Sequence, residues 1–189
     1  MKKIIRCEWA NSSEAMQQYH DNEWGVPVHD DRIHFEFLIL EAAQAGLTWA
    51  TILKKRQSYR SAFANFDPGK VARFNTAKIK ELMVDPAIIR NKLKIAAAIN
   101  NANCFLAIQK EFGSFDAYVW QFVNNKSINN NLQSIEQIPS QSDVSVLLSK
   151  DLKKLGFKFV RPVIIYSYMQ AVGLVNDHVR TCHCYRNFK

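Results

Sequence analysis

Apolar residues recur three and four positions apart along most of the chain, which is the spacing of one face of an α-helix. The clearest stripe predicts a helix that Asp30 or Asp31 caps and that ends near Gly46. A second helix is predicted from Thr48 to about Phe63, and little in the sequence favours strands. The apolar members of the first stripe are Phe35, Leu38, Ile39 and Ala42.

Capping residues predict further helices in the middle of the chain. Asp67 followed by Pro68 opens a short helix, and Thr76 caps another. Residues 88–112 are predicted to form one long helix, and residues 114–123 a further helix rich in aromatic side chains. The chain is therefore predicted to be mostly helical.

The last third of the chain has the strongest pattern. After a long exposed loop at 124–142, rich in Asn, Ser and Gln, a helix is predicted from about 143 to 155. A turn at Gly156 leads to another helix from about Arg161, with Pro162 in its first turn. Backbone N–H groups in such a turn can bind a phosphate, although core helices joined by a glycine turn are also common without a ligand.

Length and composition are those of a protein that folds by itself. The 189 residues can bury a sizeable core and predict one domain over 1–189. Hydrophobic residues make up 48% and charged residues 22%, which argues against disorder. No run approaches the roughly 20 apolar residues of a membrane helix, and no signal-peptide core follows residues 1–6, so we expect no membrane contact and a cytoplasmic protein.

Positive charge is concentrated in two segments. The net charge of +8 favours a polyanionic partner, although many basic proteins bind none. Residues 54–94 hold eleven Lys or Arg against three acidic residues, and residues 150–161 hold five against one. Solvated helix faces and phosphate contacts to DNA are both consistent with this distribution.

Cysteine and histidine residues near the two ends have the types and spacing of a zinc site. Four cysteines are too sparse and too unevenly spaced for a disulfide framework in a chain of this length. Isolated Cys and His are more often core or surface residues than ligands, and spacing does not exclude His183 and Cys184 as competitors. The candidate ligands are Cys7, His20, His178 and Cys182, of which the last two lie four positions apart and could face one metal ion from a single helical turn.

One carboxylate lies in a strongly apolar segment. Glu41 falls within residues 35–53 beside Gln44, and a buried carboxylate costs free energy unless it is paired or used. Periodicity alone favours a different place for Glu41, at the solvent-exposed edge of an amphipathic helix. Four aromatic residues leave a similar choice between stacking on a base and filling the core. They are Trp9, Tyr19, Trp24 and Trp49.

Seven segments, in order and over nearly the whole chain, together resemble the bacterial 3-methyladenine DNA glycosylase I family. Any one of them could arise by chance, but the set at these separations is highly specific. The segments are CEW (7–9), YHDNEWGVP (19–27), EAAQAGLTW (41–49), IIR (88–90) with Lys94, GFKFV (156–160), YSYMQA (166–171) and GLVNDH (173–178).

The resemblance implies an all-α member of the helix-hairpin-helix DNA glycosylase superfamily, with the hairpin pair at about 143–172. It implies a structural Zn²⁺ that joins the two ends through Cys7, His20, His178 and Cys182. It also implies a pocket that binds the damaged base, formed by Trp9, Tyr19, Glu41 and Trp49. The DNA-binding residues that it implies are Gln44, Gly46 and Leu47 in a wedge and Gly156, Lys158 and Arg161 at the hairpin.

The activity that the resemblance implies is hydrolytic excision of 3-methyladenine from alkylated double-stranded DNA, the first step of base excision repair. Methylation at N3 gives the base a positive charge that weakens its bond to the sugar and favours stacking on aromatic faces. Glu41 is expected to hydrogen-bond the extruded base and stabilise its departure, with water as the nucleophile and a monomer as the active form. The rival hypothesis is a zinc-stabilised protein that senses alkylated DNA without cleaving it.

Three details of the resemblance carry expectations of their own. Met16 replaces an aromatic residue that family members often have, so one wall of the pocket is expected to differ. Arg161 replaces a usual glycine, which is expected to add a phosphate contact or to reshape the hairpin exit. Asp177 lies beside His178 and is expected to orient the metal ligands.

Overall fold

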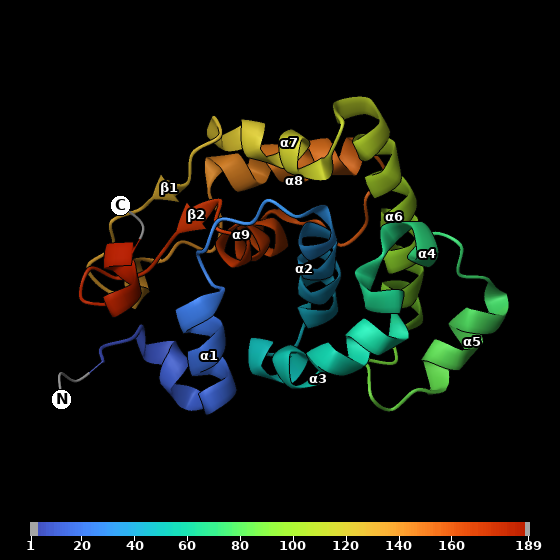
Figure 1. Cartoon of the computed structure of the whole chain (residues 1–189), viewed down its shortest axis with the longest axis horizontal. Coiled ribbons are helices and arrows are strands. Elements are labelled where there is room, and N and C mark those ends of the chain that lie inside the picture. The colour runs from blue at the N-terminus through green and yellow to red at the C-terminus, as the bar shows by residue number, and fades with distance from the viewer. Residues whose placement is uncertain (1–3, 188–189) are drawn as a thin grey trace.

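The computed structural model describes residues 4–187 and shows a mostly helical chain (Figure 1). Within that range the α-helices are α1 (Glu14–Asn22), α2 (Asp31–Gln44), α3 (Trp49–Ala62), α4 (Pro68–Val71), α5 (Thr76–Val84), α6 (Lys92–Phe112), α7 (Phe115–Trp120), α8 (Asp143–Lys154) and α9 (Pro162–Ala171). Five 3-10 helices are η1 (Glu8–Ser12), η2 (Ala64–Phe66), η3 (Gln121–Val123), η4 (Ile135–Gln137) and η5 (His183–Asn187). Two short strands are β1 (Ile128–Asn129) and β2 (Val175–Asn176). None of these helices is long and apolar enough to cross a membrane.

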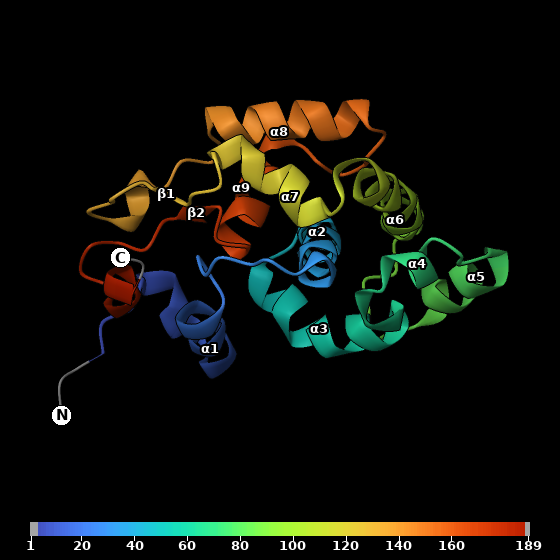
Figure 2. The same cartoon turned by 45° about the horizontal axis from the view of Figure 1, so that its top comes forward.

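Helix α2 lies at the centre of the molecule, between α9 and α6 and next to α3 (Figures 1 and 2). All ten residues from 34 to 43 are buried, so the helix has no solvent-exposed face over most of its length. A helix surrounded on every side needs no amphipathic stripe. The placement of Glu41 at an exposed edge, which periodicity favoured, is therefore wrong: Glu41 is only 5% exposed.

The predicted caps set most helix starts. The Asp30 carboxylate accepts hydrogen bonds from the backbone N–H groups of Arg32 and Ile33, and the Thr48 hydroxyl accepts one from Thr51. The helices predicted near Asp30, Thr48, Asp67 and residue 143 are all confirmed.

Two predicted helix starts differ from the structure. Asn75, rather than Thr76, caps α5, because the Asn75 side chain accepts from the Lys78 N–H. The long helix begins at Lys92, rather than Ile88. Ile88 is buried in the turn that precedes α6, so its apolar character serves packing in a loop and does not extend the helical stripe.

The segment 124–142 is not the fully exposed loop that its polar composition predicts. Ile128 and Asn129 form β1, which pairs in parallel with β2 in the register Ile128 to Val175. Leu132 is also buried, so this segment is attached to the core at two places.

The helix, turn and helix predicted in the last third are confirmed as α8, a turn and α9, which lie side by side (Figures 1 and 2). Gly156 has φ +91° in this turn, a value that glycine adopts without strain. Side chains of α6 hold the turn: Asn100 donates to the Gly156 carbonyl at 2.8 Å, and the Asn101 amide exchanges two hydrogen bonds with the Lys158 backbone. The turn is thus fixed to the long helix.

Candidate functional site

A pocket of about 300 Å³ lies between η1, α1, the α2–α3 junction and α9. The four residues expected to bind a base all line this pocket, so the structure brings together side chains from three separate parts of the sequence. The complete lining is Trp9, Met16, Tyr19, Trp24, Glu41, Gln44, Trp49, Ile138, Ser167 and Gln170.

Aromatic rings form most of the wall. The Tyr19 and Trp49 rings lie 5.2 Å apart between centroids, and the Trp9 and Trp24 rings meet edge to face at 5.0 Å. Met16 is buried at the pocket and contributes a flexible thioether to this wall. The pocket therefore offers aromatic faces to a planar ligand.

Glu41 is the acidic side chain in the pocket lining. No hydrogen bond or ion pair joins its carboxyl group to any side chain or backbone group within residues 4–187. Burial raises the pKa of Glu41 to about 8, because a low-dielectric site disfavours the charged form. Burial and the nearby Glu41 also raise the pKa of Tyr19. A buried carboxyl group without a partner, facing a pocket, is a strong candidate for contact with a ligand.

Three lining residues were not predicted from the sequence. Ser167 and Gln170 lie three positions apart on α9, and Ile138 follows η4. The one available signal was that Ser167 and Gln170 fall within the YSYMQA segment of the resemblance. Trp49 adds an unexpected feature, because its indole Nε1 is buried and has no acceptor among the described residues.

The sequence led us to expect that Asp177 orients the metal ligands, and this expectation is wrong. Its carboxylate accepts hydrogen bonds from the Tyr166 hydroxyl, the Asn130 amide and the Gln170 amide, each at 2.7 Å. This network connects β1 and β2 to α9 and fixes the amide nitrogen of the pocket residue Gln170. Asp177 therefore supports the pocket wall, whereas its neighbour His178 faces the other way, toward the cluster described below.

A trough leads from the pocket across the surface to the turn between α8 and α9. Its first part, of about 440 Å³, shares Glu41, Gln44 and Ser167 with the pocket. Its second part, of about 600 Å³, shares Ala45 and Arg161 with the first. The expected DNA-binding residues Gln44, Gly46, Leu47, Lys158 and Arg161 all line the trough, and Gly156 lies in the turn at its far end.

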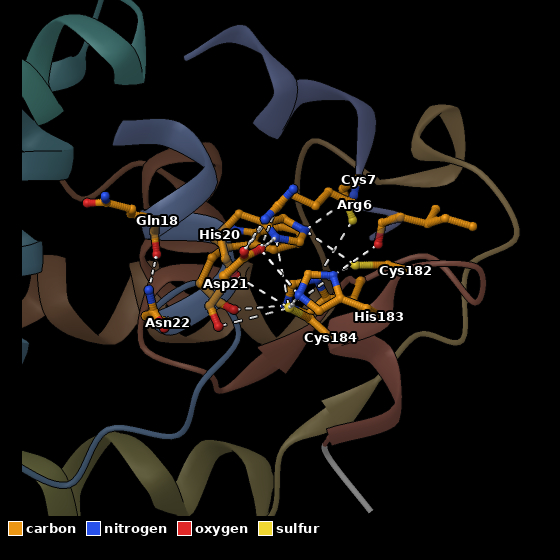
Figure 3. A network of polar contacts seen from close by, with 12 residues as sticks. Arg6, Cys7, Gln18, His20, Asp21, Asn22, Cys182, His183 and Cys184 are labelled. Atoms are coloured by element: carbon orange, nitrogen blue, oxygen red, sulfur yellow. Dashed lines mark hydrogen bonds and ion pairs between the residues drawn. The ribbon is translucent and has the colours of Figure 1, made fainter. Parts of the chain in front are cut away.

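Four buried side chains converge where the two ends of the chain meet (Figure 3). The Cys182 sulfur lies 3.4 Å from His20 Nε2 and 3.6 Å from His178 Nδ1, and the Cys7 sulfur lies 3.7 Å from the same His178 nitrogen. All four cysteines of the chain are free. Cys7, His20, His178 and Cys182 could therefore hold one metal ion, as the spacing indicated.

Neighbouring groups orient the two imidazole rings of this cluster. The other nitrogen of His20, Nδ1, lies 2.8 Å from an Asp21 carboxylate oxygen, and the other nitrogen of His178, Nε2, lies 2.9 Å from the Trp24 carbonyl. Such contacts fix the tautomer and aim the remaining nitrogen at a metal. The Asp21 carboxylate also accepts hydrogen bonds from two nitrogens of the Arg6 guanidinium group (Figure 3). Asp21, not predicted from the sequence, thus has the orienting place expected of Asp177.

His183 and Cys184, the competing ligands, lie at the edge of the cluster. With Cys182 they form a smaller group of three, in which His183 is partly exposed. His183 also donates its backbone N–H to the Ile5 carbonyl at 2.8 Å, which joins the ends of the described chain. Hydrogen bonds from the thiols of Cys184 and Cys7 lower the pKa of Cys182. His183 and Cys184 thus lie next to the four candidate metal ligands and do not take the place of any of them.

Comparison with known proteins shows the family of the chain. The family model for methyladenine glycosylase matches residues 9–185. The chain is 47% identical over 180 residues to DNA-3-methyladenine glycosylase 1 of Escherichia coli K12, covering 95% of this chain and 96% of that one. It is 42% identical to DNA-3-methyladenine glycosylase of Haemophilus influenzae, covering 95% and 97%.

Solved structures show the same likeness. A crystal structure of 3-methyladenine DNA glycosylase I superposes with a TM-score of 0.93 at 45% identity, covering 95% of this chain and 99% of that one. The enzyme of Staphylococcus aureus, solved to explain 3-methyladenine recognition, superposes with a TM-score of 0.92 at 37% identity, covering 95% of each. With the family model matching nearly all of its length, this chain belongs to the methyladenine glycosylase family.

Proposed function

We propose that this protein is a monofunctional DNA glycosylase that extrudes 3-methyladenine from alkylated double-stranded DNA and excises it by hydrolysis, as the start of base excision repair. The observation that carries the proposal is Glu41: a buried carboxyl group without a protein partner, in a pocket with aromatic walls. The activity named for the relatives from Escherichia coli and Haemophilus influenzae is of the same kind.

In this proposal the pocket receives the extruded base. The volume of about 300 Å³ suits a planar base, and the rings of Tyr19, Trp49 and Trp9 supply stacking surfaces for a cationic one. The Glu41 carboxylate accepts hydrogen bonds from the edge of the base and stabilises it as the bond to the sugar breaks. Water then attacks the sugar carbon, because the lysines of the hairpin are assigned to phosphate contact.

In this proposal the trough binds the DNA duplex. We assign Gln44, Gly46 and Leu47 to the wedge that fills the gap left by the extruded base, since Leu47 is 40% exposed at a turn next to the pocket. The α8–α9 pair acts as a helix-hairpin-helix phosphate anchor through Gly156, Lys158 and Arg161. The side chains of Lys158 and Arg161 are exposed, which leaves them available to DNA phosphates. One domain and one chain hold all these parts, so the active form is a monomer.

We propose that the Cys and His cluster binds a single structural Zn²⁺. Zinc bonds of about 2.3 Å to sulfur and 2.0–2.1 Å to nitrogen, arranged tetrahedrally, separate those atoms by about 3.6 Å. The separations of 3.4, 3.6 and 3.7 Å between Cys and His atoms match this value. Two thiolates and two imidazoles leave no coordination position for a substrate, so zinc would supply cohesion between the two ends and no chemistry at the base.

The deciding experiment is single-turnover release of free bases from methylated duplex DNA. Wild type is expected to release 3-methyladenine readily and 7-methylguanine poorly, because the edge of 7-methylguanine presents different groups to Glu41. Glu41→Gln is expected to release 3-methyladenine more slowly while its fold, by circular dichroism, and its duplex affinity stay the same. Tight binding of methylated duplex by wild type without release of base would instead support the rival, a non-cleaving sensor.

A further inference from the structure

Lys94 belongs to a segment of the resemblance that has no role in the function proposed above. It lies in the first turn of α6, and its ammonium group donates to two backbone carbonyls, those of Ala43 and Ala45, each at 2.7 Å. Its side chain is partly buried, and burial lowers its pKa. Two short hydrogen bonds to one short stretch of backbone make Lys94 a clamp on that stretch.

The two carbonyls belong to the C-terminal end of α2. The last carbonyls of a helix have no partner within the helix, and the negative end of the helix dipole lies there, so a cation is favoured. Helix α2 ends at Gln44, and its cap residue Ala45 lacks the backbone cap bond that closes α1 and α3. Lys94 takes the place of that bond from a different helix.

The chain turns sharply directly after this clamp. The Leu47 N–H donates to the Gln44 carbonyl at 2.6 Å, Ala45 has φ −46° and ψ 113°, and Gly46 has φ +83°. These are the features of a type II β-turn, in which glycine supplies the positive φ at the third position. The turn presents Leu47, 40% exposed, to the trough.

The clamp acts on the one peptide that decides the type of this turn. Type I and type II turns differ mainly in the orientation of their central peptide, here the Ala45–Gly46 peptide. Its carbonyl oxygen is the Ala45 oxygen that Lys94 holds. Rotation of the peptide toward the type I orientation would break this hydrogen bond, so the charge on Lys94 keeps the turn in its type II form.

We propose that Lys94 is a positioning residue for excision: it holds the Gln44–Leu47 turn in the conformation in which Leu47 enters the DNA. This rests on the proposed function of the turn as a wedge. Lys94 lines neither the pocket nor the trough. Its effect therefore depends on whether a base has to be extruded from a duplex.

The test compares Lys94→Met, which keeps the apolar stem and removes the donor, with wild type. We expect single-turnover excision of 3-methyladenine from methylated duplex to fall by about tenfold, since a displaced positioning group costs rate. Excision from methylated single strands is expected to change much less. Affinity for free 3-methyladenine, followed by tryptophan fluorescence, is expected to stay the same. Lys94→Arg, which restores a cationic donor, is expected to recover most of the duplex rate.

Lys55→Met is the matched control. The Lys55 ammonium also donates to two backbone carbonyls, those of Pro86 and Ala87, at 3.0 and 3.2 Å. These carbonyls belong to a loop that lines neither the pocket nor the trough. The two variants remove the same charge and the same type of clamp. We expect Lys55→Met to keep the wild-type ratio of duplex to single-strand excision, whatever its effect on thermal stability.

A double-mutant cycle with Leu47→Ala tests whether Lys94 acts through the wedge. If it does, Lys94→Met lowers duplex excision strongly in wild type and little in the Leu47→Ala background. Equal duplex rates for Lys94→Met and Lys55→Met, or full additivity with Leu47→Ala, would overturn the inference. Absence of 3-methyladenine release by wild type would instead overturn the proposed function.

Discussion

At the scale of single residues, Glu41 shows how surroundings give an ordinary carboxyl group a special chemistry. Burial raises its pKa to about 8, so in the free protein the group is largely protonated at neutral pH. In the proposed function, a methylated base with a positive charge would favour the carboxylate form of Glu41 on entering the pocket. The proton is then released, and the binding of a cationic base is linked to pH.

This linkage predicts the pH dependence of excision. Glu41 with a pKa of about 8 is half ionised at pH 8. At protein concentrations below saturation, the single-turnover rate on methylated duplex should therefore rise from about pH 6 through 8 and level off above about pH 9. Glu41→Gln should lack this rise. Rates of both proteins across that range check the prediction, and an equal slope in the variant would assign the pH dependence to another group.

The same pKa predicts an effect on stability. The pKa of Glu41 is higher in the folded than in the unfolded chain. The stability that the protonated Glu41 contributes to the folded chain is therefore fully present below about pH 4.5 and is lost as pH rises through 8. Glu41→Gln cannot ionise, so it should gain stability over wild type across this window. The gain has an upper bound of roughly 5 kcal/mol, lessened by water in the pocket. Melting temperatures of both proteins against pH would test it, and a difference independent of pH would contradict it.

At the scale of elements, the turn between α8 and α9 is held rigidly to α6 while its charged side chains are exposed. Replacing Lys158 and Arg161 by Ala should therefore weaken binding to all duplexes alike and lower the salt slope by about 1 for each phosphate that is no longer neutralised. Excision of an already bound base should change little. Lys126→Ala, which removes an exposed charge from the 124–142 segment, serves as the control. An unchanged salt slope after both replacements would place this turn away from the DNA.

Helix ends were predictable where a capping side chain marks them. Asp30, Thr48 and Asp67 cap their helices as the sequence indicates, because these short-range hydrogen bonds depend on neighbours in the chain. Helix α1 was not predicted although Ser13 caps it by accepting a hydrogen bond from the Met16 N–H, and η1, which has no such cap, was not predicted either. The predicted start of α6 was wrong although Asn91 caps this helix by accepting a hydrogen bond from the Lys94 N–H. The predicted exposure of Glu41 was wrong because burial depends on the elements that surround α2.

The candidate site could be predicted only in part from local sequence. The pocket aromatics and the four cluster residues were named from the resemblance, and local spacing alone left each of them ambiguous. The role of Asp177 was assigned from its place beside His178, yet its side chain contacts Tyr166, Asn130 and Gln170. Adjacent residues of an extended segment point to opposite sides, so a neighbour in sequence need not share a site.

At the scale of the whole molecule, the cluster of Cys7, His20, His178 and Cys182 closes a loop that contains nearly all the helices. Metal binding to the folded chain should therefore stabilise it. We predict one tightly bound zinc per chain by metal analysis and a clear drop in melting temperature in Cys7→Ser with His178→Ala. Full stability of that variant, or a chelator-resistant preparation without zinc, would contradict the prediction.

Asp21 should tune the affinity of this site. Its carboxylate contacts His20 Nδ1 at 2.8 Å, and removal of such a partner typically costs about 10–100-fold in metal affinity. Asp21→Asn should therefore release zinc to a competing chelator more readily than wild type. Asp143→Asn, at the start of α8, is a control that leaves the cluster unchanged. Equal release by Asp21→Asn and Asp143→Asn would mean that His20 is oriented without Asp21.

The position of the cluster residues also sets when the two ends can be joined during translation. Cys7 leaves the ribosome before the other three residues of the cluster, and His178 follows it 171 positions later. A nascent chain that stops before β2 carries Cys7 and His20 without their counterparts. Closure of the cluster therefore has to wait until His178 and Cys182 have been made, and a metal ion that needs all four residues would act on the chain only after that point.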